Sequence, residues 1–208
     1  AYGCFNRPGQ VRFGTVGRPM PFLEMRLADS GEVLFRSPTL MQGYYREPQL
    51  SAQALEGGWL HTGDKGEVDA DGYLRITGRV KDIFKTSKGK YVAPAPIEGE
   101  IAQNTWVEQV CLMGSNRDKP LALIDLSPAA RAQAREQIAA DLLATLELLN
   151  AALPAHERLS HLLLVSESWT VDNGSLTPTL KIRRNVLEAR YAEWVARLPH
   201  QPAVHWED

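Results

Sequence analysis

The strongest candidate for chemistry in this sequence is a single lysine, Lys181, near the C-terminus. It follows an Asn173-Gly174 turn signal and a polar stretch in which Pro178 favours an extended backbone at the preceding residue. A lysine is a compact cation with a long reach, and it suits a phosphoryl oxygen. The alternative is a solvated loop lysine, which is the commoner case for a lone surface cation.

A basic segment upstream of Lys181, residues 79–90, is a second candidate. Its cations are Arg79, Lys81, Lys85, Lys88 and Lys90. Ser87 and Gly89 add a hydroxyl and flexible backbone N–H groups beside these cations, which are the ingredients of an anion pocket. A solvated basic loop explains the same residues equally well. Taken with Lys181, the segment indicates nucleotide chemistry performed by a mobile lid.

A third candidate is the carboxylate of Asp64, which follows Thr62 and Gly63 after an apolar pair of residues. A carboxylate held by a turn can accept hydrogen bonds from two neighbouring hydroxyls, as on a ribose. An ordinary turn that closes a hairpin is the alternative, and the tripeptide alone favours it.

Composition is that of an ordinary soluble globular protein, with 44% hydrophobic and 23% charged residues. The 208 residues allow one large or two small domains, and a net charge of −2 provides no overall field for nucleic acid. The two cysteines, Cys4 and Cys111, form no metal-binding pattern, and the histidine spacing predicts no metal site. With no signal-like segment or membrane-length apolar run, we expect a cytoplasmic protein, or the cytoplasmic face of a membrane-associated one.

The first part of the chain, residues 10–78, is predicted to be β-structure. Short alternating segments separated by Asp- and Gly-containing turns favour a small antiparallel barrel or sandwich. The expected strands are 23–28, 33–36, 66–69 and 73–77, and the expected short helix is 48–55.

The second part mixes strands and helices, so the whole chain is assigned to the α+β class. We expect strands at 107–113, 121–126 and 162–165, and helices at 94–103, 128–153 and from 181 onward. Two apolar stripes at helical spacing predict core faces. They are Ile138, Leu142, Leu146, Leu149 and Leu153, and Leu187, Tyr191, Trp194 and Leu198. The change of pattern places the domain boundary between residues 1–78 and 79–208.

Taken in order, several short motifs resemble the adenylate-forming (AMP-binding) superfamily, and most of all its long-chain fatty acyl-CoA ligases. The resemblance spans nearly the whole chain, and the order of the motifs is more specific than any one of them. The motifs are Tyr2-Gly3, Gly-Thr-Val-Gly-Arg-Pro at 14–19, Met-Gln-Gly-Tyr-Tyr at 41–45, and the segments 58–64, 71–73, 78–83, 88–98 and 176–181.

The resemblance implies an enzyme that joins a fatty acid to CoA through an acyl-adenylate, releasing pyrophosphate and AMP, with ATP, Mg²⁺ and CoA as ligands. It assigns nucleotide binding to Tyr2, Asp64 and Arg79, with Tyr2 on the adenine and Asp64 on the ribose. Lys181 is the implied catalytic residue of adenylation, and Lys81 is the implied hinge of a mobile C-terminal lid. Lys85 is implied to be catalytic in the thioester step, where Ser87, Lys88 and Gly89 face CoA.

Two departures from the family pattern shape the expectation. Asn6 stands where the family has a Glu that helps to hold Mg²⁺, so no residue is assigned as a metal ligand. The family's large N-terminal part, with its phosphate loop and acyl pocket, has no counterpart in these residues. We therefore expect a C-terminal portion that is inactive alone, from a parent that binds small molecules, not nucleic acid, and can associate peripherally with membranes. The alternatives are a ligase for another carboxylic acid and a degenerate, non-catalytic nucleotide-binding module.

Overall fold

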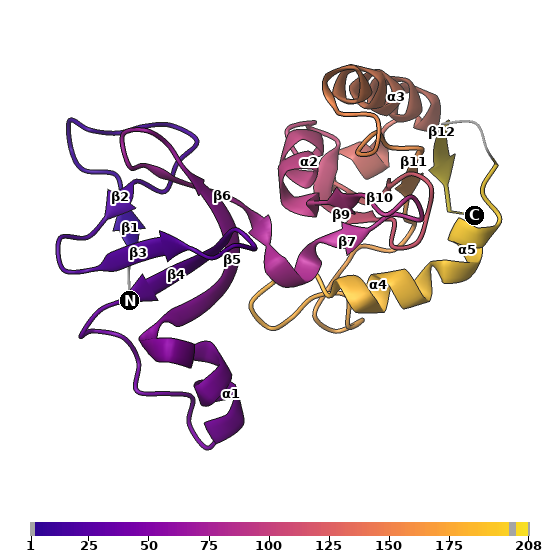
Figure 1. Cartoon of the computed structure of the whole chain (residues 1–208). Coiled ribbons are helices and arrows are strands. Elements are labelled where there is room, and N and C mark those ends of the chain that lie inside the picture. Colours follow the sequence, from indigo (N-terminus) through magenta and orange to yellow (C-terminus); the bar gives the residue numbers. More distant parts are fainter. Residues whose placement is uncertain (1–2, 200–202, 208) are drawn as a thin grey trace. The chain divides into compact units, whose positions relative to one another are not determined.

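The computed structural model describes residues 3–199 and 203–207 of the chain (Figure 1). The chain divides into two compact units, Ala1–Ile83 and Phe84–Asp208. The first unit thus extends a few residues beyond the boundary that the sequence pattern suggests. No helix in the described part of the chain has the length and apolar character needed to cross a bilayer.

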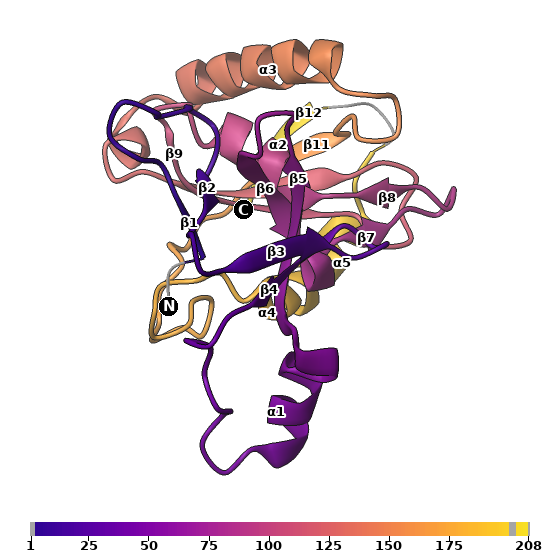
Figure 2. The same cartoon turned by 60° about the vertical axis from the view of Figure 1, so that its left-hand side comes forward.

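The first unit is built on a four-stranded antiparallel sheet with the order β3-β4-β5-β6 (Figure 2). Its strands are β3 (Glu24–Leu27), β4 (Glu32–Arg36), β5 (Leu60–Val68) and β6 (Leu74–Arg79). A small second sheet pairs β1 (Cys4–Phe5) with β2 (Arg18–Pro19), and α1 (Pro48–Ala54) and a 3₁₀ turn (Glu56–Gly58) precede β5. All four expected strands and the short helix are confirmed, although β5 begins well before the predicted start.

Of the two expected forms, a barrel or a sandwich, the closed barrel is not formed in the described part of the first unit. The strands follow one another as a meander, and the free edge of β6 receives only one isolated bridge, from Gly17 to Leu74. Four short strands are too few to close on themselves, since even small barrels use five or more. The α+β class is correct, and the sheet is open rather than a barrel.

The second unit is a four-stranded mixed sheet with helices on both faces. Its strands are β9 (Val107–Met113), β10 (Leu121–Leu126), β11 (His161–Leu164) and β12 (Ala203–Trp206), in the order β12-β11-β10-β9. The helices α2 (Pro94–Ile101) and α3 (Arg135–Ala152) cover one face, and α4 (Arg184–Arg190) and α5 (Ala192–Ala196) cover the other. A short hairpin of β7 (Phe84–Lys85) and β8 (Tyr91–Val92) precedes α2.

Burial on both faces explains the composition of β10, in which every residue is buried. Side chains of a strand alternate between faces, so a sheet covered on both sides needs continuous apolar runs. Leu112, Ala122 and Ile124 pack with α2 and α3, whereas Leu121 and Leu123 pack with α4 and α5. The predicted apolar stripes supply the facing residues: Ile138, Leu142 and Leu146 are buried, as are Leu187 and Tyr191.

Two helices begin later than the sequence predicts. The segment after Ser127 forms only a 3₁₀ turn (Ala130–Ala132), because the Arg131 side chain turns back to Asp125 and the backbone is extended at Gln133. The last predicted helix begins at Arg184 rather than at Lys181, and it breaks at Tyr191. Lys181 therefore lies on a loop and not on a helix.

Candidate functional site

Asp64 is the last residue of an irregularity in the pairing of β4 with β5. Leu34 pairs with His61 and Glu32 pairs with Lys65, so residues 62–64 face the single position 33. Gly63 has a φ of 71°, a left-handed conformation that glycine adopts without strain. Such a bulge bends a strand and redirects the side chains next to it.

The bulge is held by side-chain hydrogen bonds. The hydroxyl of Thr62 donates to the carbonyl oxygen of Val33 at 2.7 Å and accepts from the backbone N–H of Asp64 at 3.1 Å. The backbone N–H of Gly63 donates to the Glu32 carboxylate at 2.8 Å. Glu32 is a residue that the sequence pattern did not reveal, because its partner is far along the chain and no local motif marks it.

Asp64 and Arg79 are directly opposite each other in β5 and β6. Nε of Arg79 donates to Oδ1 of Asp64 at 2.9 Å. Among the described residues, no hydrogen bond reaches Oδ2 of Asp64. The carboxylate is about one-third exposed, so one oxygen is fixed while the other remains available to a ligand.

A small cleft of about 140 Å³ opens beside Asp64. Its other lining residues are Gly3, Cys4, Val16, Val33, Phe35, Thr62, Leu74 and Ile76. Burial raises the pKa of the Cys4 thiol to about 11, so this wall of the cleft is neutral at physiological pH. Ligand pockets are usually about 300–1,000 Å³, so this cleft suits one part of a nucleotide, such as its sugar.

Lys81 lies in a 3₁₀ turn (Val80–Asp82) that follows Arg79 and ends at the limit of the first compact unit. Its side chain is exposed. Lys81 thus lies where the chain passes from one unit to the other, the position at which the resemblance implies a hinge.

The hairpin β7–β8 carries the sequence-predicted residues 85–89. Lys85 pairs with Tyr91, and its ammonium lies 5.7 Å from the centre of the Tyr91 ring. The backbone N–H groups of Ser87 and Gly89 donate to carbonyl oxygens of Arg117 and Thr86, so they are engaged within the protein. The loop therefore presents side chains rather than backbone donors, and Lys88 already forms an exposed ion pair with Asp118 at 2.7 Å.

Lys181 is exposed at the end of a tight backbone turn. The backbone N–H of Thr177 donates to the carbonyl oxygen of Lys181 at 2.8 Å, and the N–H of Lys181 donates to the Thr177 hydroxyl at 3.0 Å. An isolated bridge joins Leu176 to Ile182, whose side chains pack against the core of the second unit. In the described part of the chain, no carboxylate forms an ion pair with Lys181.

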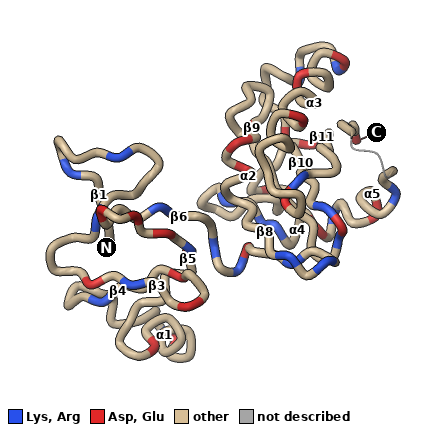
Figure 3. The backbone as a smooth tube through the Cα atoms, turned by 45° about the horizontal axis from the view of Figure 1, so that its top comes forward, with Lys and Arg blue, Asp and Glu red and all other residues tan. Residues whose placement is uncertain are grey.

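The structure thus brings Asp64 next to Arg79, and it places Lys85 and residues 87–89 on one hairpin. Lys181 lies on a separate loop of the second unit. Figure 3 shows further Lys and Arg positions around β8 and at the start of α4. Tyr2 lies outside the described residues.

Within residues 3–199 and 203–207, the structure provides no cluster suited to Mg²⁺. Among the described residues, no group of three or more His, Cys, Asp or Glu side chains is placed to hold a metal ion. The amide of Asn6 is engaged in its own loop: it donates to the carbonyl oxygen of Thr15 and accepts from the N–H of Arg12. The described residues therefore do not form a Mg²⁺ site by themselves.

Comparison with known protein families identifies the second unit. Residues 81–201 match the AMP-binding enzyme C-terminal domain. Over 199 residues the chain is 33% identical to the long-chain-fatty-acid–CoA ligase FadD15 of Mycobacterium tuberculosis, covering 88% of this chain and 33% of the relative. It is 32% identical to human long-chain-fatty-acid–CoA ligase 6, covering 94% of this chain and 33% of the relative.

A solved structure extends the likeness to both units. The anthranilate CoA ligase AuaEII, solved in complex with anthranoyl-AMP, is 31% identical and matches with a TM-score of 0.71. The match covers 93% of this chain and 37% of that structure. The chain therefore spans about a third of the length of the curated relatives that it matches.

Proposed function

The chain belongs to the AMP-binding enzymes, whose C-terminal domain it contains, and we propose that it supplies the C-terminal part of an ATP-dependent long-chain fatty acyl-CoA ligase. The fatty acid attacks the α-phosphate of ATP to give an acyl-adenylate and pyrophosphate. The CoA thiol then attacks the activated carbonyl, forming the thioester and releasing AMP. Its relatives named as long-chain-fatty-acid–CoA ligases support this choice.

The observation that carries the proposal is the placement of Lys181. Its ammonium group is solvent-exposed on a hydrogen-bonded turn, and no carboxylate within the described chain neutralises it. Negative charge accumulates around phosphorus as the acid attacks, and a positioned ammonium stabilises that transition state. An exposed tip can also withdraw, which the second step requires so that the thiol can enter.

The other sequence-predicted residues take the roles that the resemblance implies. Asp64 would accept hydrogen bonds from the ribose hydroxyls through its open oxygen, with Arg79 holding the other oxygen and Tyr2 stacking on adenine. Lys81 would be the hinge between adenylation and thioester formation. Lys85 and the exposed side chains of Ser87 and Lys88, beside Gly89, would face CoA, whose phosphates attract cations.

ATP and CoA are the proposed co-substrates, and Mg²⁺ would accompany the ATP phosphates without a ligand cluster from the described residues. We expect the ligase to act in the cytoplasm and to associate peripherally with membranes. The substrate class supports membrane association, because each buried CH₂ of an acyl chain contributes about 0.8 kcal/mol to partitioning into a bilayer.

A ligase for an aromatic acid is the second candidate. The likeness to an anthranilate CoA ligase, at 31% identity, favours it. Comparing hexadecanoate with benzoate and anthranilate as substrates of the complete enzyme would separate the two candidates. A degenerate, non-catalytic module would activate none of these acids.

The decisive test is Lys181→Ala in the complete ligase. We expect acid-dependent ATP–pyrophosphate exchange to fall about 100–1,000-fold, the usual effect of removing one transition-state donor. Thioester formation from chemically prepared acyl-adenylate should change by no more than about twofold, since that step does not use this lysine. Lys119→Ala, at an exposed lysine of the same unit, is the matched control. Pyrophosphate exchange that persists in Lys181→Ala would remove the basis of the proposal.

The 208-residue chain alone should give no detectable acyl-adenylate.

A further inference from the structure

The turn that carries Lys181 is too short to hold its own shape. Its stem consists of the Leu176–Ile182 bridge and one hydrogen bond below it, from the N–H of Arg183 to the carbonyl oxygen of Ser175. Isolated two-stranded hairpins are only marginally stable in water. Leu180 also has a φ of 59°, which is costly for a residue with a β-carbon and persists only where the surroundings impose it. The hydrogen bonds within the turn, between Thr177 and Lys181, therefore need support from the residues at its base.

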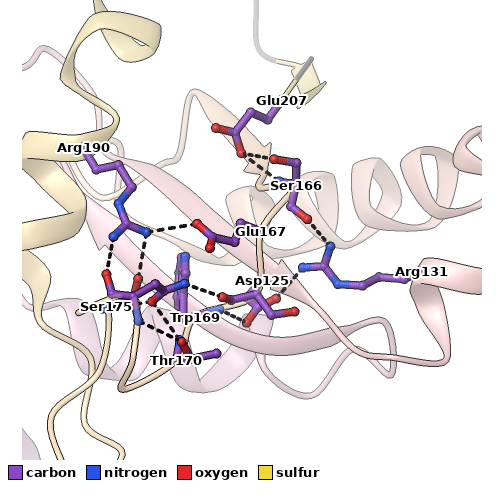
Figure 4. Close-up of polar contacts among 11 residues, drawn as sticks. Asp125, Arg131, Ser166, Glu167, Trp169, Thr170, Ser175, Arg190 and Glu207 are labelled. Atoms are coloured by element: carbon purple, nitrogen blue, oxygen red, sulfur yellow. Dashed lines mark hydrogen bonds and ion pairs between the residues drawn. The ribbon is translucent and has the colours of Figure 1, made fainter.

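Ser175, at this base, is completely buried and is held by Arg190 from α4. Nη1 of Arg190 donates to the Ser175 hydroxyl at 3.0 Å, and Nη2 donates to the carbonyl oxygen of Asn173 at 2.6 Å. Glu167 lies 3.7 Å from Nη1 and orients the guanidinium (Figure 4). The segment entering the turn and the helix that follows it are thus joined by one side chain with two donor arms. A lysine cannot reproduce this planar fork.

The base of the turn is also connected to the central sheet. The side-chain oxygen of Asn173 accepts from the backbone N–H groups of Thr170 and Ser175. The N–H of Leu176 donates to the carbonyl oxygen of Thr170, and the N–H of Trp169 donates to the buried carboxylate of Asp125 in β10 at 2.9 Å (Figure 4). Arg190 is the partly accessible member of this connection, so it can be replaced without opening the core.

We propose that Arg190 is a positioning residue for Lys181: its guanidinium fork clamps Ser175 to Asn173 and thereby fixes the turn that presents the lysine. This inference rests on the proposed function, in which Lys181 acts in adenylation and not in thioester formation. Arg190 does not contact substrate in this scheme. Its loss should leave the lysine present but badly placed.

The first test uses the 208-residue chain and requires no activity. Hydrogen exchange of the amides of Ser175, Thr177, Lys181 and Arg183 should accelerate about tenfold or more in Arg190→Ala, because the clamp no longer limits local opening. Arg190→Lys keeps the cation at the end of α4 but not the planar fork. Its melting temperature should therefore return to that of the wild type, whereas the amides of the turn should exchange as fast as in Arg190→Ala. Ser175→Ala removes only one of the two hydrogen bonds of the clamp. The amide exchange rates of this variant should therefore lie between those of the wild type and those of Arg190→Ala. Unchanged exchange in all three variants would overturn the proposal.

The second test separates the half-reactions in the complete ligase. A displacement of about 1 Å can cost about 100-fold in rate, so Arg190→Lys should lower pyrophosphate exchange about ten- to hundredfold. Thioester formation from prepared acyl-adenylate should stay near the wild-type rate. Arg197→Ala is the control, since this arginine pairs with Glu193 on α5 and touches no part of the turn. An equal fall in both half-reactions would show a general structural defect and contradict the inference. If Lys181→Ala abolishes pyrophosphate exchange and Arg190→Lys leaves its rate unchanged, the positioning role of Arg190 is overturned while the proposed function stands.

Discussion

The ion pair between Asp64 and Arg79 joins the bulge in β5 to the end of β6, where the chain enters the turn between the two units. The two residues pair in register, and Nε of Arg79 lies 2.9 Å from Oδ1 of Asp64. Asp64 follows the left-handed Gly63, and Arg79 ends β6, immediately before the turn that contains Lys81. One ion pair therefore separates the carboxylate of Asp64 from the segment where the first unit ends.

The first prediction concerns Asp64→Asn. A partly exposed ion pair adds at most about 1 kcal/mol to stability, so the melting temperature of the chain should hardly change. The loss of a charged acceptor for ligand hydroxyls costs about 1.5–3 kcal/mol, which raises the KM for ATP about tenfold or more in the complete ligase. Steady-state kinetics over a range of ATP concentrations measures the effect.

Glu67→Gln provides the matched control for Asp64→Asn. Glu67 and Arg75 pair in the same two strands, with Nη2 of Arg75 2.6 Å from Oε2 of Glu67, and both side chains are exposed. This control should leave the KM for ATP unchanged. Equal increases in the two variants would mean that the strand pair, and not the Asp64 carboxylate, determines nucleotide binding.

The second prediction compares two glycines of the first unit. Gly63 has open space where a β-carbon would stand, so Gly63→Ala adds only the cost of a left-handed alanine, about 1–2 kcal/mol. At Gly17 the φ is 92° and an added β-carbon would overlap the backbone of Phe5. Gly17→Ala should therefore lower the melting temperature of the first unit clearly more than Gly63→Ala, as measured by calorimetry. Indistinguishable melting temperatures would contradict this account of the two positions.

Local patterns predicted the elements that depend on local spacing. The apolar stripe of Ile138, Leu142 and Leu146 marks the buried face of α3, and the apolar runs at 107–113 and 121–126 coincide with β9 and β10. These predictions succeed because side-chain periodicity follows directly from backbone geometry. The family motifs likewise identified the candidate residues without showing how they are held.

Features that depend on partners far along the chain could not be predicted from local sequence patterns. Residues 203–206 form β12 by pairing in parallel with β11, and nothing in Ala-Val-His-Trp alone predicts a strand. Glu32 stabilises the Asp64 bulge from the neighbouring strand, and Arg190 reaches back to Ser175 from α4. Each of these contacts is created by the fold, so residue spacing cannot reveal it.

The strands β11 and β12 hold a histidine pair that couples stability to pH. His161 is buried, and its Nδ1 lies 3.2 Å from Nε2 of His205, close enough for one proton to be shared. Burial, together with the nearby His205 and Arg117 cations, lowers the pKa of His161, and burial lowers the pKa of His205. The folded chain therefore accepts protons less readily than the unfolded chain, whose histidines titrate near 6.5.

The third prediction follows from the sign of this difference. A depressed pKa in the folded state means that stability is complete above pH 6.5 and is lost as pH falls below it. Each proton taken up on unfolding contributes a slope of at most about 1.4 kcal/mol per pH unit. The urea concentration at the unfolding midpoint, followed by tryptophan fluorescence, should therefore decrease as pH is lowered from about 7.5 to 5.5, a window above the titration of most carboxylates.

His205→Gln should reduce this pH dependence, whereas His156→Gln, at a half-exposed histidine beside Glu157, should leave it as in the wild type. If His205→Gln keeps the full pH dependence, the coupling resides in other groups.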